Sequence, residues 1–305
     1  MQNTAFLFPG QGSQTPGMAA AFAQHPTTKA LFQQADDVLG FKLSALMADG
    51  PAEELTKTEN AQPALLVAGY AAAAYVGSLK KDLAPKSIAT GHSLGLYTAA
   101  LAAGSYDFEF GLKLVRARGL AMSKAASGGM LAVLGLEIEQ AEAVAADAEV
   151  SVANDNSPGQ QILSGPGKNL EKAAELAKKA GAKKTIVLPV SGPFHTRAMQ
   201  PAVDEVKAML VANPIKAPKV PLVANTSPMF INNAEALTGE LVGQIAARIR
   251  WREAVGFMAD NGVTTAIELG VGSVLCGLVK RCDPRISCIS LTSPEEVDTW
   301  LESQA

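Results

Sequence analysis

Residues 91–95 constrain the fold of this chain more than any other stretch. They read Gly-His-Ser-Leu-Gly, with Ser93 between two glycines. The apolar run 87–90 before them predicts a strand, and residues 94–103 after them are rich in helix-forming side chains. A strand, a tight turn and a helix form the setting of a nucleophile elbow, where small residues let the backbone turn sharply and expose the serine hydroxyl. The alternative is a glycine-rich turn that carries no chemistry.

The chain has only three histidines, so the search for a partner of Ser93 is short. A serine hydroxyl becomes a good nucleophile when a base takes its proton, and histidine is the usual base. His92 adjoins Ser93, and neighbouring side chains on an extended turn point apart. His25 precedes a proline at an apparent helix start, which predicts a surface position. His195 follows the predicted strand 185–191. Because open α/β sheets place ligands at the carboxyl ends of their strands, we predict that His195 is the base.

No acidic residue between Ser93 and His195 is a convincing third member of a catalytic triad. Asp155 lies in the run Asn-Asp-Asn-Ser-Pro-Gly, which is typical of a turn. A backbone carbonyl group could orient the base in place of a carboxylate.

A tetrahedral intermediate also needs N–H donors for its oxygen anion. The N–H group of Leu94, the residue after the serine, is one expected donor. The other is expected from Gln11, because the glycines on either side of it let its backbone approach a ligand closely. The same loop does not match a dinucleotide-binding fingerprint, because Thr15 stands where the third glycine is required.

Two arginines, Arg116 and Arg118, lie on a predicted helix after the elbow, and their spacing puts them on different faces. An arginine on a helix is usually a solvated or salt-bridged surface residue. A buried arginine near a serine nucleophile would instead select a substrate with a free carboxylate, through a bidentate pair. The residues alone leave both possibilities open.

Composition excludes several classes of function. The net charge is −3 without a basic block, so neither nucleic acid nor an anionic membrane surface is an expected partner. The most apolar stretch, residues 63–76, is too short to span a bilayer, and the first residues lack the pattern of a signal peptide. The three cysteines lack Cys-x-x-Cys spacing, so we expect no disulfide framework and no zinc site, and a reducing cytoplasm.

Short β-rich runs alternate with helical stretches over most of the 305 residues, which predicts an α/β fold. Helices are expected over residues 26–39, 61–81 and 107–126. Within residues 130–191 the order becomes β-α-β-β-α-β, the order of a ferredoxin-like unit. We therefore predict a small subdomain, residues 128–191, inserted into a large subdomain made of residues 1–127 and 192–305. Residues 220–225 and 264–270 are expected to add buried strands to the main sheet.

Several motifs along the chain occur together in one known family. They are FPGQGSQ, AQPAL, GHSLG, NSPGQ and SGPFH, in this order. The chain therefore resembles the malonyl-CoA:acyl-carrier-protein transacylases over nearly its whole length. The resemblance implies an α/β-hydrolase-like large subdomain with a ferredoxin-like insertion.

The resemblance also implies roles for individual residues. Ser93 would be the acylated nucleophile and His195 its base, with the oxyanion held by the backbone N–H groups of Gln11 and Leu94. Arg118 would hold the malonyl carboxylate, and the backbone carbonyl of Arg250 would orient the histidine. The residues that would shape the substrate site are Met122, Asn154, Asn156 and Phe194. The chain departs from the family at Leu96, where a glutamate is common.

The expected function is transfer of a malonyl group from malonyl-CoA to the phosphopantetheine thiol of an acyl carrier protein, most naturally in fatty acid biosynthesis. No bound cofactor or metal is expected, and the chain is expected to act as a cytoplasmic monomer. Three alternatives stay open: a transacylase that serves malonate decarboxylase or a polyketide synthase, an acyl-thioester hydrolase, and a carrier-docking subunit with a vestigial serine.

Overall fold

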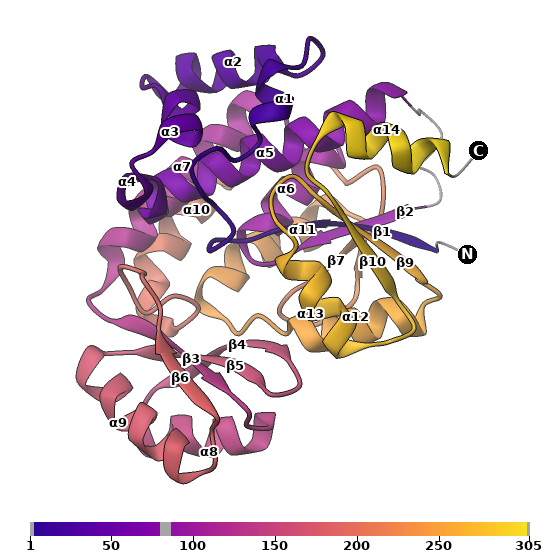
Figure 1. Cartoon of the computed structure of the whole chain (residues 1–305). Helices are drawn as coiled ribbons and strands as arrows, with labels where there is room; N and C mark the ends of the chain where they lie inside the picture. Colours follow the sequence, from indigo (N-terminus) through magenta and orange to yellow (C-terminus); the bar gives the residue numbers. More distant parts are fainter. Residues whose placement is uncertain (1–2, 80–86, 304–305) are drawn as a thin grey trace.

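The computed structural model describes residues 3–79 and 87–303, which build two subdomains around two separate sheets (Figure 1). The large sheet has the strand order β10-β9-β1-β2-β7-β8. All neighbouring strands from β10 to β7 are parallel, and β7 pairs with β8 antiparallel. The strands of this sheet are β1 (Thr4–Phe8), β2 (Ser87–Gly91), β7 (Leu222–Val223), β8 (Phe230–Ile231), β9 (Thr265–Leu269) and β10 (Ser287–Leu291). The α/β fold predicted from the sequence is confirmed.

The small sheet is antiparallel, in the order β4-β5-β3-β6, and two helices cover one of its faces. Its elements follow one another as β3 (Gly129–Leu134), α8 (Ile138–Ala148), β4 (Ser151–Ser157), β5 (Gln160–Gly165), α9 (Gly167–Lys179) and β6 (Lys184–Val187). This is the β-α-β-β-α-β order that the sequence predicted for a ferredoxin-like unit. The division of the chain at residues 128 and 191 stays a prediction.

Helices cover both faces of the large sheet. The α-helices of this subdomain are α1 (Ala20–Gln24), α2 (Lys29–Leu39), α3 (Leu43–Asp49), α4 (Ala52–Thr56), α5 (Thr58–Leu79), α6 (Leu94–Ala102), α7 (Phe108–Ala125), α10 (Gln200–Ala212), α11 (Ala234–Gly243), α12 (Trp251–Asp260), α13 (Val274–Cys282) and α14 (Pro294–Glu302). Two 3₁₀ turns, η2 (Arg197–Met199) and η3 (Gln244–Ala246), adjoin α10 and α11. The helix expected over residues 61–81 is α5, and its last two expected residues lie outside the described ranges.

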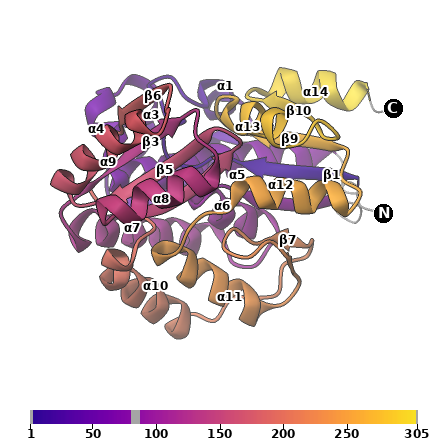
Figure 2. The same ribbon diagram turned by 90° about the horizontal axis from the view of Figure 1, so that it is seen from below.

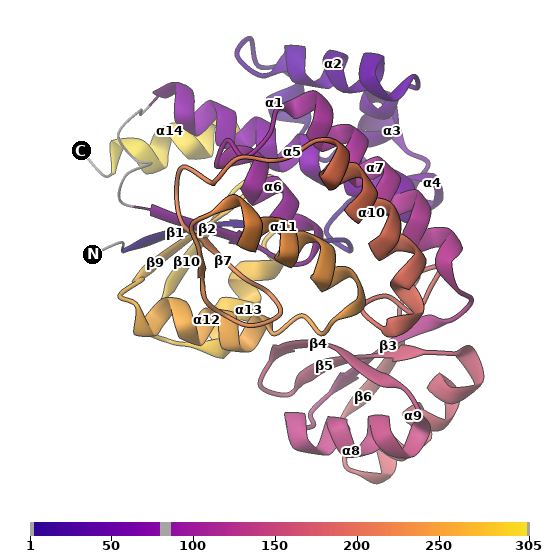
Figure 3. The same cartoon turned by 180° about the vertical axis from the view of Figure 1, so that it is seen from behind.

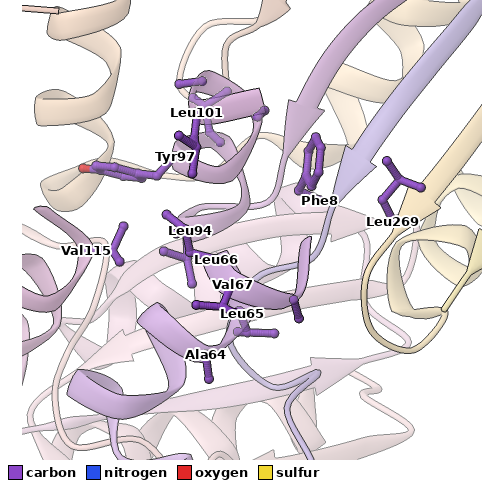
Figure 4. Packing of buried hydrophobic residues seen from close by; sticks show 14 of the residues in the cluster. Phe8, Ala64, Leu65, Leu66, Val67, Leu94, Tyr97, Leu101, Val115 and Leu269 are labelled. Atoms are coloured by element: carbon purple, nitrogen blue, oxygen red, sulfur yellow. The ribbon is translucent and has the colours of Figure 1, made fainter. Parts of the chain in front are cut away.

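Strand β1 explains why the sheet needs cover on both faces, because its side chains alternate between two hydrophobic clusters. Ala5 and Leu7 pack in the cluster under α12 and α13, which lie side by side in Figure 2. Phe8 points to the opposite face, where α5 and α6 supply the packing partners shown in Figure 4. A strand that buries both faces carries a continuous apolar run, as Thr-Ala-Phe-Leu-Phe does here.

None of the helices within residues 3–79 and 87–303 combines the length and apolar character needed to cross a membrane.

From the cysteine spacing we expected no disulfide framework, but one pair of cysteines forms a disulfide. Cys276 in α13 and Cys288 in β10 form a disulfide, with their Cα atoms 5.1 Å apart, while Cys282 is free. The chain leaves α13 and returns as β10 against it, so two cysteines that are distant along the helix-turn-strand segment meet in space. Spacing alone carries no information on this return.

The turn between β2 and α6 packs with almost no room for side chains. A Cβ atom at Gly95 would overlap the backbone oxygen of Phe8 at the end of β1, and a Cβ atom at Gly91 would overlap the backbone of Gly95. The two glycines of the motif therefore let α6 start directly against the central strand.

This packing predicts opposite effects for two Gly→Ala substitutions in helices. Gly95→Ala forces the backbone of α6 away from Phe8 and should lower the free energy of unfolding by about 1–3 kcal/mol, the usual cost of overpacking. Gly77→Ala, in the exposed last turn of α5 with open space around it, should raise it by up to about 1 kcal/mol. Urea unfolding of the two variants and the parent chain checks both signs. Equal effects would contradict the close packing of the elbow.

Candidate active site

Ser93 lies in the turn between β2 and α6 with a strained backbone. Its φ and ψ angles are 53° and −103°, a combination that few non-glycine residues adopt. Such conformations persist where the surrounding structure holds them, and they occur often in active sites. Here the N–H group of His92 donates to the carbonyl of Phe8 at 3.1 Å, and the N–H group of Gly95 donates to the carbonyl of His92 at 3.0 Å. The turn is a nucleophile elbow in its geometry.

His195 is brought to the serine by the loop after β6. Its Nε2 atom lies 2.9 Å from the Oγ atom of Ser93, and its Nδ1 atom lies 2.7 Å from the backbone oxygen of Gln244. A carbonyl oxygen only accepts hydrogen bonds, so Nδ1 must carry the proton of the neutral ring. Nε2 is then the free acceptor for the serine hydroxyl, which is the tautomer that a general base needs.

The assignment of the orienting carbonyl to Arg250 is wrong, because Gln244 supplies it. Arg250 precedes α12, and its N–H group donates to the carbonyl of Asn225 at 2.7 Å while its guanidinium pairs with Glu253. The turn η3 after α11 aims the carbonyl of Gln244 at His195 instead. Every residue carries a backbone carbonyl, so the sequence does not show which carbonyl accepts from the histidine. The assignment was therefore made to the wrong residue.

The surroundings of His195 favour the neutral ring. Burial lowers its pKa to about 3, with further lowering by the nearby charges of Arg118 and His92 and a partial opposing effect from the carbonyl of Gln244. His195 is therefore uncharged, and able to accept a proton, at any pH near neutrality.

Arg118 is the second group that touches the serine. It projects from α7, is 1% exposed, and its Nη2 atom donates to Ser93 Oγ at 3.0 Å. Its Nη1 atom donates to Oε1 of Gln62 at 2.8 Å, and its guanidinium stacks over Tyr97 with 4.9 Å to the ring centroid. Among the described residues, none of the ion pairs involves Arg118, so a buried cation stands beside the nucleophile without a carboxylate partner. Its Nε atom is buried and has no hydrogen-bond partner there.

The question of which arginine faces the site is thereby settled. Arg116 turns the other way, where it donates to the carbonyl of Glu59 and to Oδ1 of Asn60, and it packs over the ring of Phe41 at 5.0 Å.

The expected oxyanion donors lie at the same cavity as the serine. Leu94 is the first residue of α6, so its N–H group is one of those that a helix start leaves without a partner in the helix. Gln11 follows β1 in a loop that packs on the elbow at Gly10, and its side chain donates to Thr58 at 3.2 Å. The cavity is lined by these two residues together with Gln62, His92, Ser93, Arg118, Met122, Met130, Asn154, Ile162, Leu188, Phe194 and His195, among others.

Two asparagines reach the site from β4, in different ways. Asn154 lines the cavity, whereas Asn156 lies behind His92, with its Oδ1 atom 2.8 Å from His92 Nε2. The ring of His92 also packs against Trp251, with 5.6 Å between centroids, and burial lowers its pKa. Asn156 therefore supports His92 and does not touch the cavity, which corrects its assignment to the substrate site.

Asp155, between these asparagines, is not an orienting acid. Its carboxylate forms a salt bridge with Arg252 at 2.8 Å, and its N–H group donates to the carbonyl of Ile249. It lies in a strand and not in the turn that the sequence suggested.

Three contacts of the site were missed from the sequence: those of Gln62, Tyr97 and Asn225. Gln62 lies in the motif AQPAL, and Tyr97 follows Ser93 by four residues. Neither position indicates in the sequence that the side chain contacts Arg118. Asn225 is the last residue of the predicted strand 220–225, and its position at a strand end was the available signal. Leu96, where the related family commonly has glutamate, is buried in the large hydrophobic cluster.

Within the described ranges, no group of three or more histidine, cysteine, aspartate or glutamate side chains could hold a metal ion.

Known proteins of one family match this chain over nearly its whole length. The model of the acyl transferase domain family matches residues 5–282. The malonyl CoA-acyl carrier protein transacylase of Bacillus subtilis is 40% identical over 312 residues, which covers 99% of this chain and 98% of that protein. The crystal structure of an acyl-carrier-protein S-malonyltransferase from Bartonella henselae superposes with a TM-score of 0.95 at 38% identity, covering 99% of each chain. A malonyl-transacylase in complex with its type II polyketide synthase acyl-carrier protein superposes with a TM-score of 0.93 at 37% identity, again covering 99% of each chain.

The low pKa of His195 predicts a pH profile for the reactivity of Ser93. Because the ring stays neutral down to about pH 3, the rate of serine labelling by a fluorophosphonate should be nearly constant between pH 5 and 8. An ordinary histidine would halve that rate near its pKa of about 6.5. His195→Ala should slow the labelling by about 10²–10⁴-fold, and His25→Ala, whose ring packs on Tyr75 away from the site, should not. A midpoint near pH 6.5 in the parent chain would contradict the buried, neutral histidine.

Proposed function

This chain belongs to the family of malonyl CoA-acyl carrier protein transacylases, and we propose that it transfers the malonyl group through a covalent intermediate on Ser93. As a malonyl-CoA:acyl-carrier-protein S-malonyltransferase it uses a two-step exchange of thioesters. The observation that carries the proposal is the position of Ser93 Oγ, 2.9 Å from the base His195 and 3.0 Å from the buried cation Arg118.

In the first step, His195 Nε2 takes the proton of Ser93 as Oγ attacks the thioester carbonyl of malonyl-CoA. The negative charge on the carbonyl oxygen is held by the N–H groups of Leu94 and Gln11, which line the cavity. The intermediate collapses, the C–S bond breaks, and the proton passes from His195 to the departing coenzyme A thiolate. Malonyl-Ser93 remains.

In the second step, the phosphopantetheine thiol of the carrier protein takes the place of coenzyme A. His195 removes the thiol proton, the sulfur attacks the ester carbonyl of malonyl-Ser93, and the C–O bond to Oγ breaks with return of the proton to the serine. The carbonyl of Gln244 keeps the ring in the same tautomer through both steps, because the Nδ1 proton never moves.

Arg118 selects the acyl group. The carboxylate of a malonyl group supplies, through a charge-assisted pair, the anionic partner that the buried guanidinium does not find among the described residues. An acetyl group has no such carboxylate and would leave the desolvated cation unpaired. Met122 and Phe194 bound the same cavity with apolar surface, which fits a short unbranched acyl chain.

The identity of the carrier decides the pathway, and we propose fatty acid biosynthesis. A polyketide carrier is the second candidate, favoured by the similarity to the transacylase that was solved with its polyketide carrier protein. The cytoplasmic location and the monomeric state stay predictions, and the Cys276–Cys288 bond removes the cysteine argument for a reducing compartment.

The covalent step predicts a mass increase on one serine. Brief exposure to malonyl-CoA should add one malonyl group to the intact protein, and Ser93→Ala should abolish the adduct. Added holo-carrier protein should remove the malonyl group within the time that the adduct otherwise survives. Intact-protein mass spectrometry follows all three results. An adduct that decays equally fast in buffer would identify a hydrolase, and an adduct that survives in the Ser93→Ala variant would exclude Ser93 as its site.

The role of Arg118 predicts a change of substrate preference. Arg118→Ala should lower kcat/KM for malonyl-CoA by about 100-fold or more, because the charged pair with the malonyl carboxylate is lost. It should also reduce the preference for malonyl-CoA over acetyl-CoA. Arg116→Ala is the matched control, because that arginine sits on the same helix but contacts Glu59 and Asn60 outside the cavity. Competition between the two thioesters measures the preference. An unchanged ratio in Arg118→Ala would show that another group reads the carboxylate.

A further inference from the structure

The strained backbone of Ser93 is held from one side by a single side chain. The N–H group of Ser93 donates to Oδ1 of Asn225 at 2.8 Å, across 132 residues of sequence. Asn225 follows β7, the strand next to β2 in the large sheet, so its side chain meets the elbow at the carboxyl ends of two neighbouring strands.

The oxygen of Asn225 is the atom that the site uses. A backbone N–H group donates, so the atom facing Ser93 must be the amide oxygen and not the amide nitrogen. The side chain is fully buried, and its Nδ2 atom finds no partner among the described residues. Burying the Nδ2 donor without a partner costs free energy. The hydrogen bond that Oδ1 accepts from Ser93 explains why this side chain is nevertheless buried here.

Glu240 of α11 holds Asn225 in turn. Its Oε1 atom accepts from the N–H groups of Asn225 at 2.7 Å and of Thr226 at 3.0 Å, and its Oε2 atom accepts from the hydroxyl of Thr226. Glu240 is 9% exposed and forms no ion pair within the described part of the chain. Its three hydrogen bonds all go to Asn225 and Thr226, so it fixes the loop that follows β7.

The same helix end also holds the base. Glu240 and Gln244 are four residues apart, which places them on one face of a continuous helical segment made of α11 and η3. Figure 3 shows α11 beside α10. Glu240 reaches Ser93 through Asn225, and the carbonyl of Gln244 reaches His195 directly.

We propose that Asn225 and Glu240 form a positioning pair that fixes the Ser93 backbone relative to His195. The inference rests on the proposed function, because it concerns the acylation of Ser93. Neither residue touches the substrate, and both lie outside the set that lines the cavity. Loss of the pair lets the elbow relax, which lengthens the distance between Oγ and Nε2 and displaces the N–H group of Leu94. A displacement of about 1 Å in such a site costs about 10²-fold in rate.

The test compares Asn225→Ala, Glu240→Ala and Glu240→Gln with the parent chain. Single-turnover acylation by malonyl-CoA is followed by rapid-quench mass spectrometry over a range of substrate concentrations, alongside thermal unfolding. Glu240→Gln keeps an acceptor for both backbone N–H groups and leaves its amide nitrogen facing the hydroxyl of Thr226, which can accept. It is therefore the conservative variant.

The expected result is a maximal acylation rate lowered about 10- to 100-fold in Asn225→Ala and Glu240→Ala. The half-saturating malonyl-CoA concentration should change less than threefold, because Arg118 and the cavity are untouched. Glu240→Gln should restore the rate to within about threefold of the parent. If Asn225→Ala fails to fold, the comparison of the two Glu240 variants still decides.

Three results would overturn the inference: an unchanged acylation rate in the folded Asn225→Ala or Glu240→Ala variant, a Glu240→Gln variant as slow as Glu240→Ala, or a loss confined to substrate affinity. Failure of the parent chain to form any malonyl adduct would be a failure of the proposed function instead, so the parent reaction separates the two.

Discussion

The strained turn at Ser93 is the constraint around which the rest of this structure is arranged. A side chain at a positive φ is unfavourable by itself, so the turn exists only because neighbouring groups hold it. Gly95 lets α6 start against the end of β1, the carbonyl of Phe8 accepts from the N–H group of His92, and the amide oxygen of Asn225 accepts from the N–H group of Ser93. The sheet order places these groups together, since β1 and β7 both flank β2.

The second feature that shapes the site is a buried cation without an anion. Arg118 costs free energy where it stands, because its charge has left water and no carboxylate of the described residues pairs with it. The ring of Tyr97 and the amide of Gln62 compensate part of this cost. The same positive charge lowers the pKa of His195, so the group proposed to bind an acidic substrate also helps to keep the proposed base neutral. In the proposed mechanism, Arg118 therefore takes part in both substrate selection and base chemistry.

The two side chains proposed to be catalytic come from distant parts of the chain but share a support. Ser93 stands on the large sheet, and His195 comes from the loop that leaves the small subdomain. The segment made of α11 and η3 supports both: Glu240 binds Asn225, whose side chain binds the N–H group of Ser93, and the carbonyl of Gln244 accepts from His195. A helix is stiff over one turn, so this shared support helps to fix the position of the two groups relative to each other. This accounts for a site assembled between two subdomains that keeps a 2.9 Å contact.

The sequence by itself determined the elements whose signals are local. The elbow at Ser93, the alternation of strands and helices, and the order of the small subdomain all follow from patterns a few residues long. A short search among three histidines selected His195 as the candidate base, and the structure places it against Ser93. Only the tertiary structure decided that Gln244 and not Arg250 orients the base, that Arg118 faces inward, that Asn225 binds the elbow, and that Cys276 meets Cys288. The physical reason is that these contacts join groups brought together by packing, and in the case of Gln244 the group is a backbone carbonyl, which every residue carries.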